Sequence, residues 1–245
     1  MYPSDRVKLR SNVPKDADTR RLRMNHTGYF SHISALDEEI GRLMKKLAQL
    51  GIADHTIVCY SSDHGDMLGS FGLSNKNKPW EESINVPFVI RWPGVIPAGK
   101  PLDTIFSTVD IAPTLLALAG EPVPARMQGA DISDILKGKQ APGPESAFIM
   151  GEMNDGEDQQ VRTARREAKK ANGRRRPDSW RGVRTRRHTF ARHGGRWGAQ
   201  EPWLLYDNEN DPCQQHNLID DPAAAATRKE LDAMLGKWLK QVGEA

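Results

Sequence analysis

The stretch that decides the fold is residues 56–83, which read T-I-V-C-Y-S-S-D-H-G-D-M-L-G-S-F-G-L-S-N-K-N-K-P-W-E-E-S. Its first five residues are mostly β-branched or aromatic, which predicts a short buried strand. Asp63, His64 and Asp66 follow where that strand should end and a glycine-spaced loop should begin. Ligands of open α/β sheets bind at that end of a strand, so we expect a functional site here.

A helix is predicted before this strand, and a second strand and helix after it. The first helix, from Gly28, carries an apolar stripe that we expect to face a core, made of Ile33, Leu36, Ile40, Leu43, Leu47 and Leu50. Gly51 is a natural C-cap for this helix. Residues 86–92 predict the second strand, and residues 108–119 the second helix. This order of elements is typical of an α/β domain.

Beyond Gly138 the pattern changes to short strands followed by one helix. Strand patterns fall at residues 147–150, 180–192 and 203–207. A helix is predicted at about residues 223–242, with one apolar face made of Leu231, Leu235, Trp238 and Val242. Such an order predicts a small antiparallel α+β subdomain. We therefore divide the chain into an α/β part, residues 1–139, and a C-terminal subdomain, residues 140–245.

The positive charge of the chain is concentrated in one segment. Residues 161–200 hold fourteen Lys and Arg against two acids, a local net charge of +12 that leaves −9 for the rest of the chain. We expect a basic, disordered insertion at about residues 159–178.

A binding role for the basic segment is the alternative. It would contact nucleic acid or a sulfated polyanion through arginines and stacking aromatics, namely Arg174, Arg175, Arg176, Arg186, Arg187, Trp180, Phe190 and Trp197. Charge runs are more often simply solvated, so nucleic acid is not an expected partner.

Composition excludes several classes of protein. The mean hydropathy is −0.64 and no apolar run approaches the roughly twenty residues that a membrane helix needs, so no span is predicted. Residues 1–6 lack the apolar core of a secretory signal, and the compartment stays open. Two cysteines, Cys59 and Cys213, are too few for a disulfide framework or a zinc cage.

The loop offers four candidate site residues. Asp63 and His64 are adjacent on a turn and could bind one divalent ion, with Asp66 as a third ligand or as a hydrogen-bond partner of the ligands. The alternative is that Asp63 caps the loop and His64 lies on the surface. Lys76 follows a glycine-spaced segment that could place its ammonium beside a bound anion. A solvated loop lysine is the alternative for Lys76.

Several segments resemble the sulfatase family, within the alkaline phosphatase superfamily. They are S-S-D-H-G-D-M-L-G, G-L-S-N-K-N-K-P-W-E-E-S-I-N-V-P-F-V-I-R-W-P-G, V-D-I-A-P-T-L-L-A-L-A-G, W-R-G-V-R-T and L-Y-D-N-E-N-D-P. The resemblance implies that residues 1–139 form the C-terminal part of the sulfatase catalytic domain, a partial alkaline-phosphatase-like sheet sandwiched by helices. Residues 140–245 would then be the C-terminal subdomain.

The resemblance also implies roles for the candidate residues. Asp63 and His64 match the pair that binds the divalent cation, usually Ca²⁺, with Mg²⁺ or Mn²⁺ as alternatives. Lys76 matches the lysine that binds the sulfate and stabilises its leaving oxygen, so it would be both catalytic and substrate-binding. The implied activity is hydrolysis of sulfate monoesters in a sulfated small molecule or glycan.

One part of the family pattern is absent from this chain. The family nucleophile is a formylglycine made within a C-x-P-x-R-like signature, and neither Cys59 nor Cys213 begins one. The resemblance therefore implies a C-terminal portion that is inactive or incomplete in isolation, with the formylglycine expected in the N-terminal half. Two alternatives remain: a phosphodiesterase or phosphonate monoester hydrolase of the same superfamily, and a non-catalytic polyanion-binding fragment.

Overall fold

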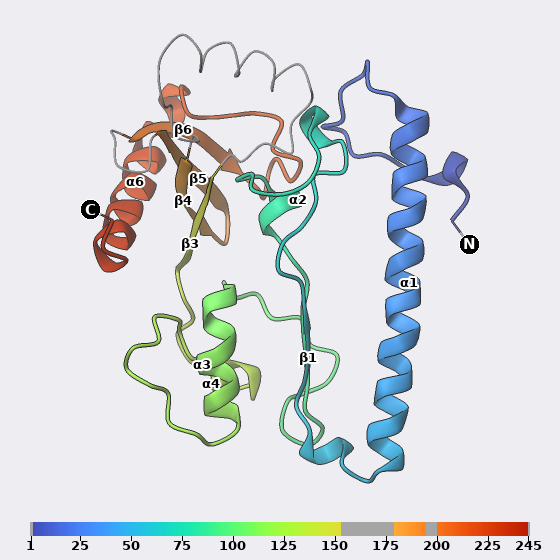
Figure 1. Ribbon diagram of the computed structural model, residues 1–245. Helices are drawn as coiled ribbons and strands as arrows, with labels where there is room; N and C mark the ends of the chain where they lie inside the picture. The colour runs from blue at the N-terminus through green and yellow to red at the C-terminus, as the bar shows by residue number, and fades with distance from the viewer. Residues whose placement is uncertain (1, 153–178, 195–199, 245) are drawn as a thin grey trace, which may run out of the picture. The chain divides into compact units, whose positions relative to one another are not determined.

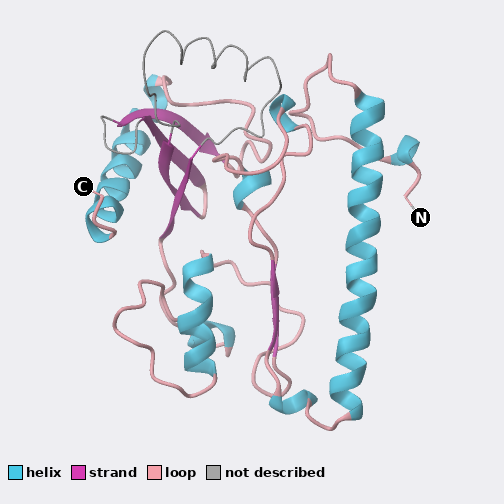
Figure 2. Cartoon of the chain, in the orientation of Figure 1, coloured by secondary structure: helices cyan, strands magenta, loops and turns pink. Residues whose placement is uncertain are grey.

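The computed structural model describes residues 2–152, 179–194 and 200–244 (Figure 1). The basic insertion predicted at about residues 159–178 lies outside these ranges. The described chain combines helices with short antiparallel strands and long connecting loops (Figure 2). It divides into two compact units.

The first unit consists of residues 1–9, 15–63 and 86–144. Its helical segments are η1 (Ser4–Arg6), α1 (Thr19–Gln49), η2 (Ala53–His55), α3 (Thr108–Leu118) and α4 (Ser133–Leu136). Its strands, β1 (Val58–Ser61) and β2 (Phe88–Arg91), pair antiparallel. A small core joins the two strands to α3 and α4, and its buried members are Leu118, Ile132 and Leu136.

Helix α1 starts earlier than the sequence predicted and ends where it predicted. The Asp18 carboxylate accepts a hydrogen bond from the N–H of Arg21 at 3.0 Å, so the helix begins at Thr19 rather than near Gly28. At the other end Gly51 has a φ of 69°, the left-handed conformation expected of a C-cap glycine.

The apolar stripe of α1 does not face a core in this structure, contrary to the prediction. Four of its residues are half exposed: Ile33 at 46%, Leu36 at 45%, Leu43 at 52% and Leu50 at 56%. Among the described residues the elements that α1 contacts most are the short segments η1 and η2. The apolar face of α1 is therefore open to solvent.

Strands β1 and β2 form a two-stranded sheet, and β1 is half-buried rather than buried as predicted. The outer edge of each strand has no strand partner among the described residues. Two strands alone are marginally stable in water. The described residues of the first unit thus contain one strand pair and not the larger helix-covered sheet that the resemblance implies.

The second unit consists of residues 10–14, 64–85 and 145–245. Its strands form one antiparallel sheet in the order β3 (Ser146–Glu152), β4 (Ser179–Thr185), β5 (His188–Gly194) and β6 (Gln200–Asp207). The strand pattern at residues 180–192 is thus a hairpin of two strands. The helical segments are η3 (Ser70–Gly72), α2 (Glu81–Ile84), η4 (Pro222–Ala224) and α6 (Ala225–Gln241).

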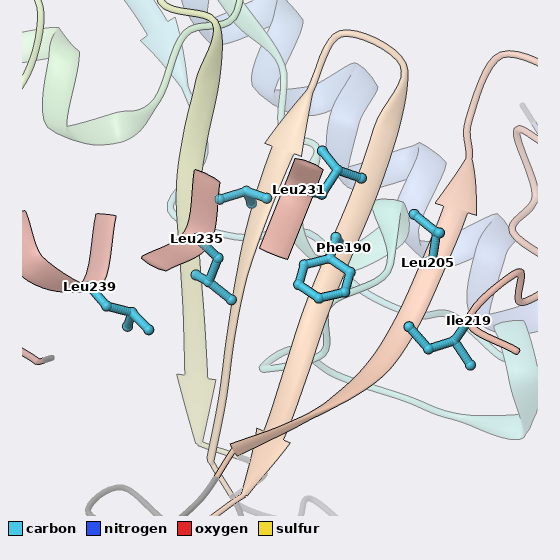
Figure 3. Close-up of a cluster of buried hydrophobic side chains, with 7 residues drawn as sticks. Phe190, Leu205, Ile219, Leu231, Leu235 and Leu239 are labelled. Carbon is cyan, nitrogen blue, oxygen red and sulfur yellow. The ribbon is translucent and has the colours of Figure 1, made fainter. Parts of the chain in front are cut away.

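Each face of this sheet has its own core. On one face α6 packs against the strands through a cluster that includes Leu231, Leu235, Phe190 and Leu205 (Figure 3). Neighbouring strand residues point to opposite faces. Accordingly, a second cluster of Trp180, Ala191, Leu204 and Tyr206 packs against Trp80 and Ile84. The segment 64–85 is therefore anchored on the sheet face opposite α6.

The described helices include none that is both long enough and apolar enough to span a membrane.

Candidate functional site

His64 and Lys76 lie in direct contact in the loop that follows β1. The Nε2 atom of His64 is 2.7 Å from Nζ of Lys76, and its Nδ1 atom is 2.7 Å from the carbonyl oxygen of Gly65. A carbonyl can only accept, so Nδ1 carries the ring proton and Nε2 presents a lone pair. The ammonium of Lys76 donates to that lone pair. The structure thus brings together two of the residues that the sequence singled out.

The backbone beside His64 requires glycine. A Cβ atom at Gly65 would lie 2.0 Å from the carbonyl oxygen of Glu82, which is far inside van der Waals contact. The N–H of Gly65 donates to the carbonyl oxygen of Ser83 at 2.9 Å. This close approach fixes the backbone from which the imidazole of His64 projects.

Asp66 stabilises the loop itself. Its Oδ1 atom accepts hydrogen bonds from the N–H groups of Leu68 at 2.9 Å and Asn75 at 3.2 Å. The N–H of Met67 donates to the carbonyl oxygen of Asn75 at 2.9 Å, and Met67 is completely buried. The carboxylate that the sequence offered as a third metal ligand therefore closes the loop between His64 and Lys76.

The loop is conformationally strained. Four non-glycine residues in it have positive φ: Leu68 at 46°, Phe71 at 56°, Asn75 at 61° and Asn77 at 69°. Such residues persist only where the surroundings hold them, and they gather at functional sites. The strain supports the choice of this loop as the candidate site.

Asp63 is an exposed residue of the first unit. It ends the first-unit segment 15–63, and His64 begins the second-unit segment 64–85. Within the described residues there is no cluster of three or more His, Cys, Asp or Glu side chains able to hold a metal. Asp63 and His64 can therefore supply at most part of a ligand set.

The aromatic residues of the loop pack against the C-terminal sheet. The rings of Phe71 and Trp80 are 5.1 Å apart, and Trp80 lies 5.8 Å from Trp203. The indole N–H of Trp80 donates to the hydroxyl of Tyr206 at 3.3 Å. These contacts show that Phe71 and Trp80 serve in packing.

Two of the three aromatic residues of the polyanion-binding alternative are buried in the structure. Trp180 is 1% exposed and Phe190 is completely buried, so neither can stack on a base. Arg187 is bound to Asp207 through two hydrogen bonds of 3.1 and 2.7 Å. Arg174, Arg175, Arg176 and Trp197 lie outside the described residues.

Sequence reasoning missed the residues that hold this loop from a distance. The amide of Asn12, which is 7% exposed, donates to Oε1 of Glu82 at 2.8 Å and to the carbonyl of Cys213 at 2.9 Å. Arg10 pairs with the same Glu82 carboxylate at 2.9 Å. No spacing rule connects Asn12 with partners that lie 70 and 201 positions away in the sequence.

Comparison with known proteins identifies the family. Residues 3–121 match the sulfatase family. An ulvan-active sulfatase of Formosa agariphila is 34% identical over 248 residues, which cover 100% of this chain and 44% of that protein. This chain belongs to the sulfatase family. An endo-4-O-sulfatase of Bacteroides thetaiotaomicron is 31% identical to this sulfatase chain, over 99% of the chain and 46% of that enzyme.

Solved structures place the sulfatase chain in the alkaline phosphatase and sulfatase fold. A structure in complex with its substrate D-glucosamine-2-N,6-O-disulfate matches with a TM-score of 0.76 and 28% identity, over 94% of this chain and 43% of that one. Phosphonate monoester hydrolase of Agrobacterium radiobacter matches with a TM-score of 0.76 and 27% identity, over 92% of this chain and 43% of that one. The chain spans less than half the length of these relatives.

Proposed function

We propose that this chain carries the cation-binding and sulfate-binding loop of a sulfuric ester hydrolase that acts on sulfate monoesters. The observation that supports this most directly is the contact of His64 with Lys76 after β1, in a chain of the sulfatase family. In this proposal Lys76 binds the sulfate and neutralises charge on the leaving oxygen, while Asp63 and His64 hold a divalent cation. Preorganised cations of this kind are the main source of rate enhancement for such a reaction.

The donor set fits a divalent cation in part. Asp63 offers carboxylate oxygens, which Ca²⁺, Mg²⁺ and Mn²⁺ all accept, and His64 offers one imidazole lone pair, which is a softer ligand than Ca²⁺ prefers. A bound cation would supply positive charge beside the sulfate oxygens. Among the described residues no further His, Cys, Asp or Glu side chain joins Asp63 and His64 in a cluster of three or more. We propose Ca²⁺, with Mg²⁺ and Mn²⁺ as the alternatives.

His64 and Lys76 cannot keep their contact when His64 binds a cation. The Nε2 atom has a single lone pair, which in this structure accepts the ammonium of Lys76 at 2.7 Å. Ligation through Nε2 would release that ammonium, which could then donate to an anion. The Lys76 side chain would then be available to bind a sulfate.

The nucleophile is proposed to lie in the part of the relatives that this chain does not span. Cys59 and Cys213 are free thiols outside the family signature, and burial raises the pKa of the Cys59 thiol, which disfavours the reactive thiolate. The proposed nucleophile is a formylglycine. We expect no turnover by the isolated chain.

The first unit offers a surface on which the rest of a catalytic domain could pack. The exposed stripe of α1 is contiguous along one helix face, and both strands of the β1–β2 pair have unpaired outer edges among the described residues. Exposed stripes and open edges are surfaces that proteins normally cover. We propose that additional polypeptide extends the strand pair into a sheet sandwiched by helices.

The proposed substrates are sulfated saccharides. This class follows from the names of the relatives, which include an N-acetylglucosamine-6-O-sulfatase of Bacteroides thetaiotaomicron that is 29% identical over 87% of this chain. The identity of the saccharide depends on parts of the site that this chain does not contain.

A chimera tests the proposal. This chain would replace the 44% of the Formosa agariphila relative that it matches, and hydrolysis of 4-nitrophenyl sulfate would be followed with and without a chelator. We expect turnover by the folded chimera, loss of turnover with the chelator, and none with the isolated chain. A folded chimera without turnover, or chelator-resistant turnover by the isolated chain, would contradict the proposal.

The phosphonate monoester hydrolase activity is the second candidate, favoured by the solved structure that matches with a TM-score of 0.76. The same chimera separates the two, because its rates on phenylphosphonate and on 4-nitrophenyl sulfate can be compared directly. A higher kcat/KM on phenylphosphonate would select the second candidate.

A further inference from the structure

Helix α2 holds both ends of the loop that carries His64 and Lys76. The carbonyl oxygen of Ser83 accepts a hydrogen bond of 2.9 Å from the N–H of Gly65, the residue after His64. The hydroxyl oxygen of Ser83 accepts one of 3.3 Å from the N–H of Lys78. Ser83 is 5% exposed, so water competes little for these bonds. The contact between His64 and Lys76 therefore depends on where α2 lies.

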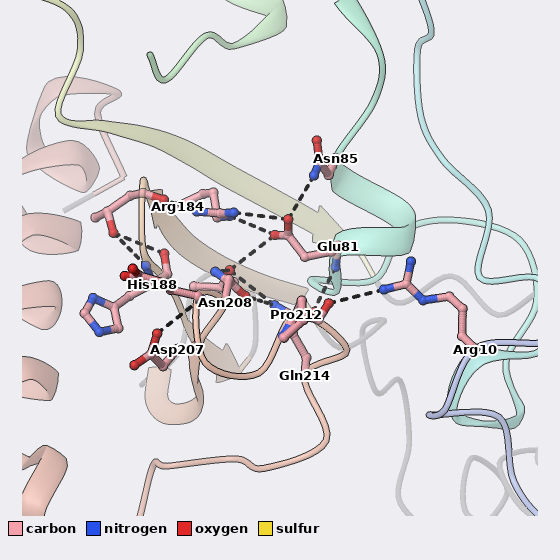
Figure 4. Close-up of polar contacts among 12 residues, drawn as sticks. Arg10, Glu81, Asn85, Arg184, His188, Asp207, Asn208, Pro212 and Gln214 are labelled. Atoms are coloured by element: carbon pink, nitrogen blue, oxygen red, sulfur yellow. Dashed lines mark hydrogen bonds and ion pairs between the residues drawn. The ribbon is translucent and has the colours of Figure 1, made fainter. Parts of the chain in front are cut away.

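Helix α2 is too short to fix its own position, because four residues form barely one turn. Its first residue, Glu81, is held by Arg184 of β4. The guanidinium donates from Nε to Oε1 at 2.8 Å and from Nη2 to Oε2 at 3.1 Å (Figure 4). The side chains of Glu81 and Arg184 are only 11% and 20% exposed. A forked pair of this kind fixes orientation as well as distance.

Gln214 fixes the backbone of the same helix. Its Oε1 atom accepts a hydrogen bond from the N–H of Glu81 at 2.9 Å, and its Nε2 atom donates to Oδ1 of Asn208 at 2.7 Å (Figure 4). Gln214 is 1% exposed and has a φ of 52°. A buried glutamine keeps this strained conformation only where its partners hold it. Gln214 is therefore a rigid support rather than a flexible surface side chain.

We infer that Arg184 and Gln214 are positioning residues for the His64–Lys76 pair, acting through Glu81 and helix α2. The inference rests on the proposed function for its catalytic meaning, but the mechanical link stands on the contacts alone. The C-terminal sheet thereby sets the geometry of the loop. Arg184 and Glu81, the two residues that make this connection, are 103 positions apart in the sequence. Displacements of about 1 Å at reacting groups cost roughly a hundredfold in rate, so such a support has functional consequences.

Arg184→Lys is the informative substitution. It keeps the positive charge but cannot reproduce the planar fork that engages both oxygens of Glu81. In the isolated chain, hydrogen exchange at the amides of Gly65 and Lys78 would be measured by NMR. We expect exchange at both amides to accelerate about tenfold, the effect of losing one charge-assisted hydrogen bond that holds α2.

A second readout reports on the pair itself. The ¹⁵N chemical shift of His64 Nε2 depends on whether it accepts a hydrogen bond from Lys76, and a purely structural role for Arg184 would leave it unchanged. We expect Arg184→Lys to move this shift toward that of a solvated ring. Glu81→Gln, which preserves the shape of the side chain, should move it in the same direction and serves if Arg184→Lys fails to fold.

Arg192→Lys is the matched control. Arg192 lies in β5 of the same sheet and pairs with Asp232 of α6 at 2.6 Å, away from α2. The two side chains are 23% and 34% exposed. The Arg192→Lys substitution should weaken the packing of α6 on the sheet and leave hydrogen exchange at the amides of Gly65 and Lys78 unchanged. Equal acceleration by both variants, or none with Arg184→Lys, would overturn the inference.

The test of the positioning role gives a result that is independent of the test of the proposed function. Exchange and chemical shift are measured without turnover, so an inactive chimera would contradict the proposed function and leave the positioning role intact. Conversely, an active chimera in which Arg184→Lys leaves the loop amides and the His64 shift unchanged would retain the function and overturn the positioning role.

Discussion

Gly65 shows how one residue sets the geometry of the site. Its position allows the backbone of α2 to approach so closely that any side chain would collide with the carbonyl of Glu82, at 2.0 Å. The sequence marked Gly65 only as one of several glycines in a loop. Residue 65 must be glycine because of its contact with Glu82 and Ser83, which lie seventeen or more positions later in the sequence. Local sequence patterns do not reveal a contact of this range.

Gly65→Ala is expected to destabilise the second unit by about 1–3 kcal/mol, because the backbone of α2 must move to admit the methyl group. Urea unfolding measures the loss of stability. The NMR signals of His64, recorded in parallel, report the change in the structure of the loop. Gly28→Ala is the control: nothing lies within 4 Å of its added Cβ, and alanine favours a helix, so stability should hold or rise. Equal stability of Gly65→Ala and the wild type would contradict the close approach.

Asp207 gives a prediction for the pH dependence of stability. Its hydrogen bond from Arg187, the largest cause, lowers the pKa of the Asp207 carboxyl below its ordinary value, as do bonds from Asn210. A depressed carboxyl pKa in the folded state stabilises the protein above the unfolded pKa of about 3.9, and this contribution is lost as the pH falls through the folded value.

Asp207→Asn should therefore lower the Tm at pH 7, and the difference from the wild type should shrink as the pH is lowered below about 4. Arg187→Met should produce the same pattern, since it removes the other half of the pair. A Tm difference that is constant between pH 7 and pH 3 would show that the charge of Asp207 is not responsible.

At the scale of elements, α6 and α1 have the same kind of apolar stripe but opposite environments. The sequence predicted a buried face for both, and the prediction is confirmed for α6, where Leu231 and Leu235 are buried. It is wrong for α1 in this structure, where Leu36 and Leu43 are about half exposed. Periodicity reports that a face is suited to packing, but it cannot report whether the chain in hand supplies the partner.

Leu235→Ala is expected to cost about 2–5 kcal/mol, since the side chain is completely buried between α6 and the sheet. Leu43→Ala removes the same atoms from an exposed position and should change the stability of the isolated chain by less than about 0.5 kcal/mol. Chemical denaturation of both variants makes the comparison. In the chimera Leu43→Ala should become destabilising if the α1 stripe is covered there, and an unchanged stability would contradict that packing.

For the whole molecule, the elements were more predictable than their assembly. Helix caps at Gly51 and Gly120, the strands and α6 follow from local patterns, and both glycines have the positive φ that capping requires. The bidentate pair of Glu81 with Arg184 joins segments 103 positions apart, and no pattern in either segment specifies the other. The candidate site divides in the same way: His64 and Lys76 were found from the sequence, but their supports were not. The division of the chain at residue 139 and the roles of Asp63, His64 and Lys76 remain predictions.

The most direct test of the central claim, that the loop after β1 binds and activates a sulfate ester, is the effect of Lys76→Ala on kcat/KM for 4-nitrophenyl sulfate in the chimera. Removing one preorganised cation from the transition state should lower kcat/KM by about 100-fold or more. Lys240→Ala, an exposed lysine in the last turn of α6, should leave it unchanged. Equal kcat/KM values for the two variants would contradict the account.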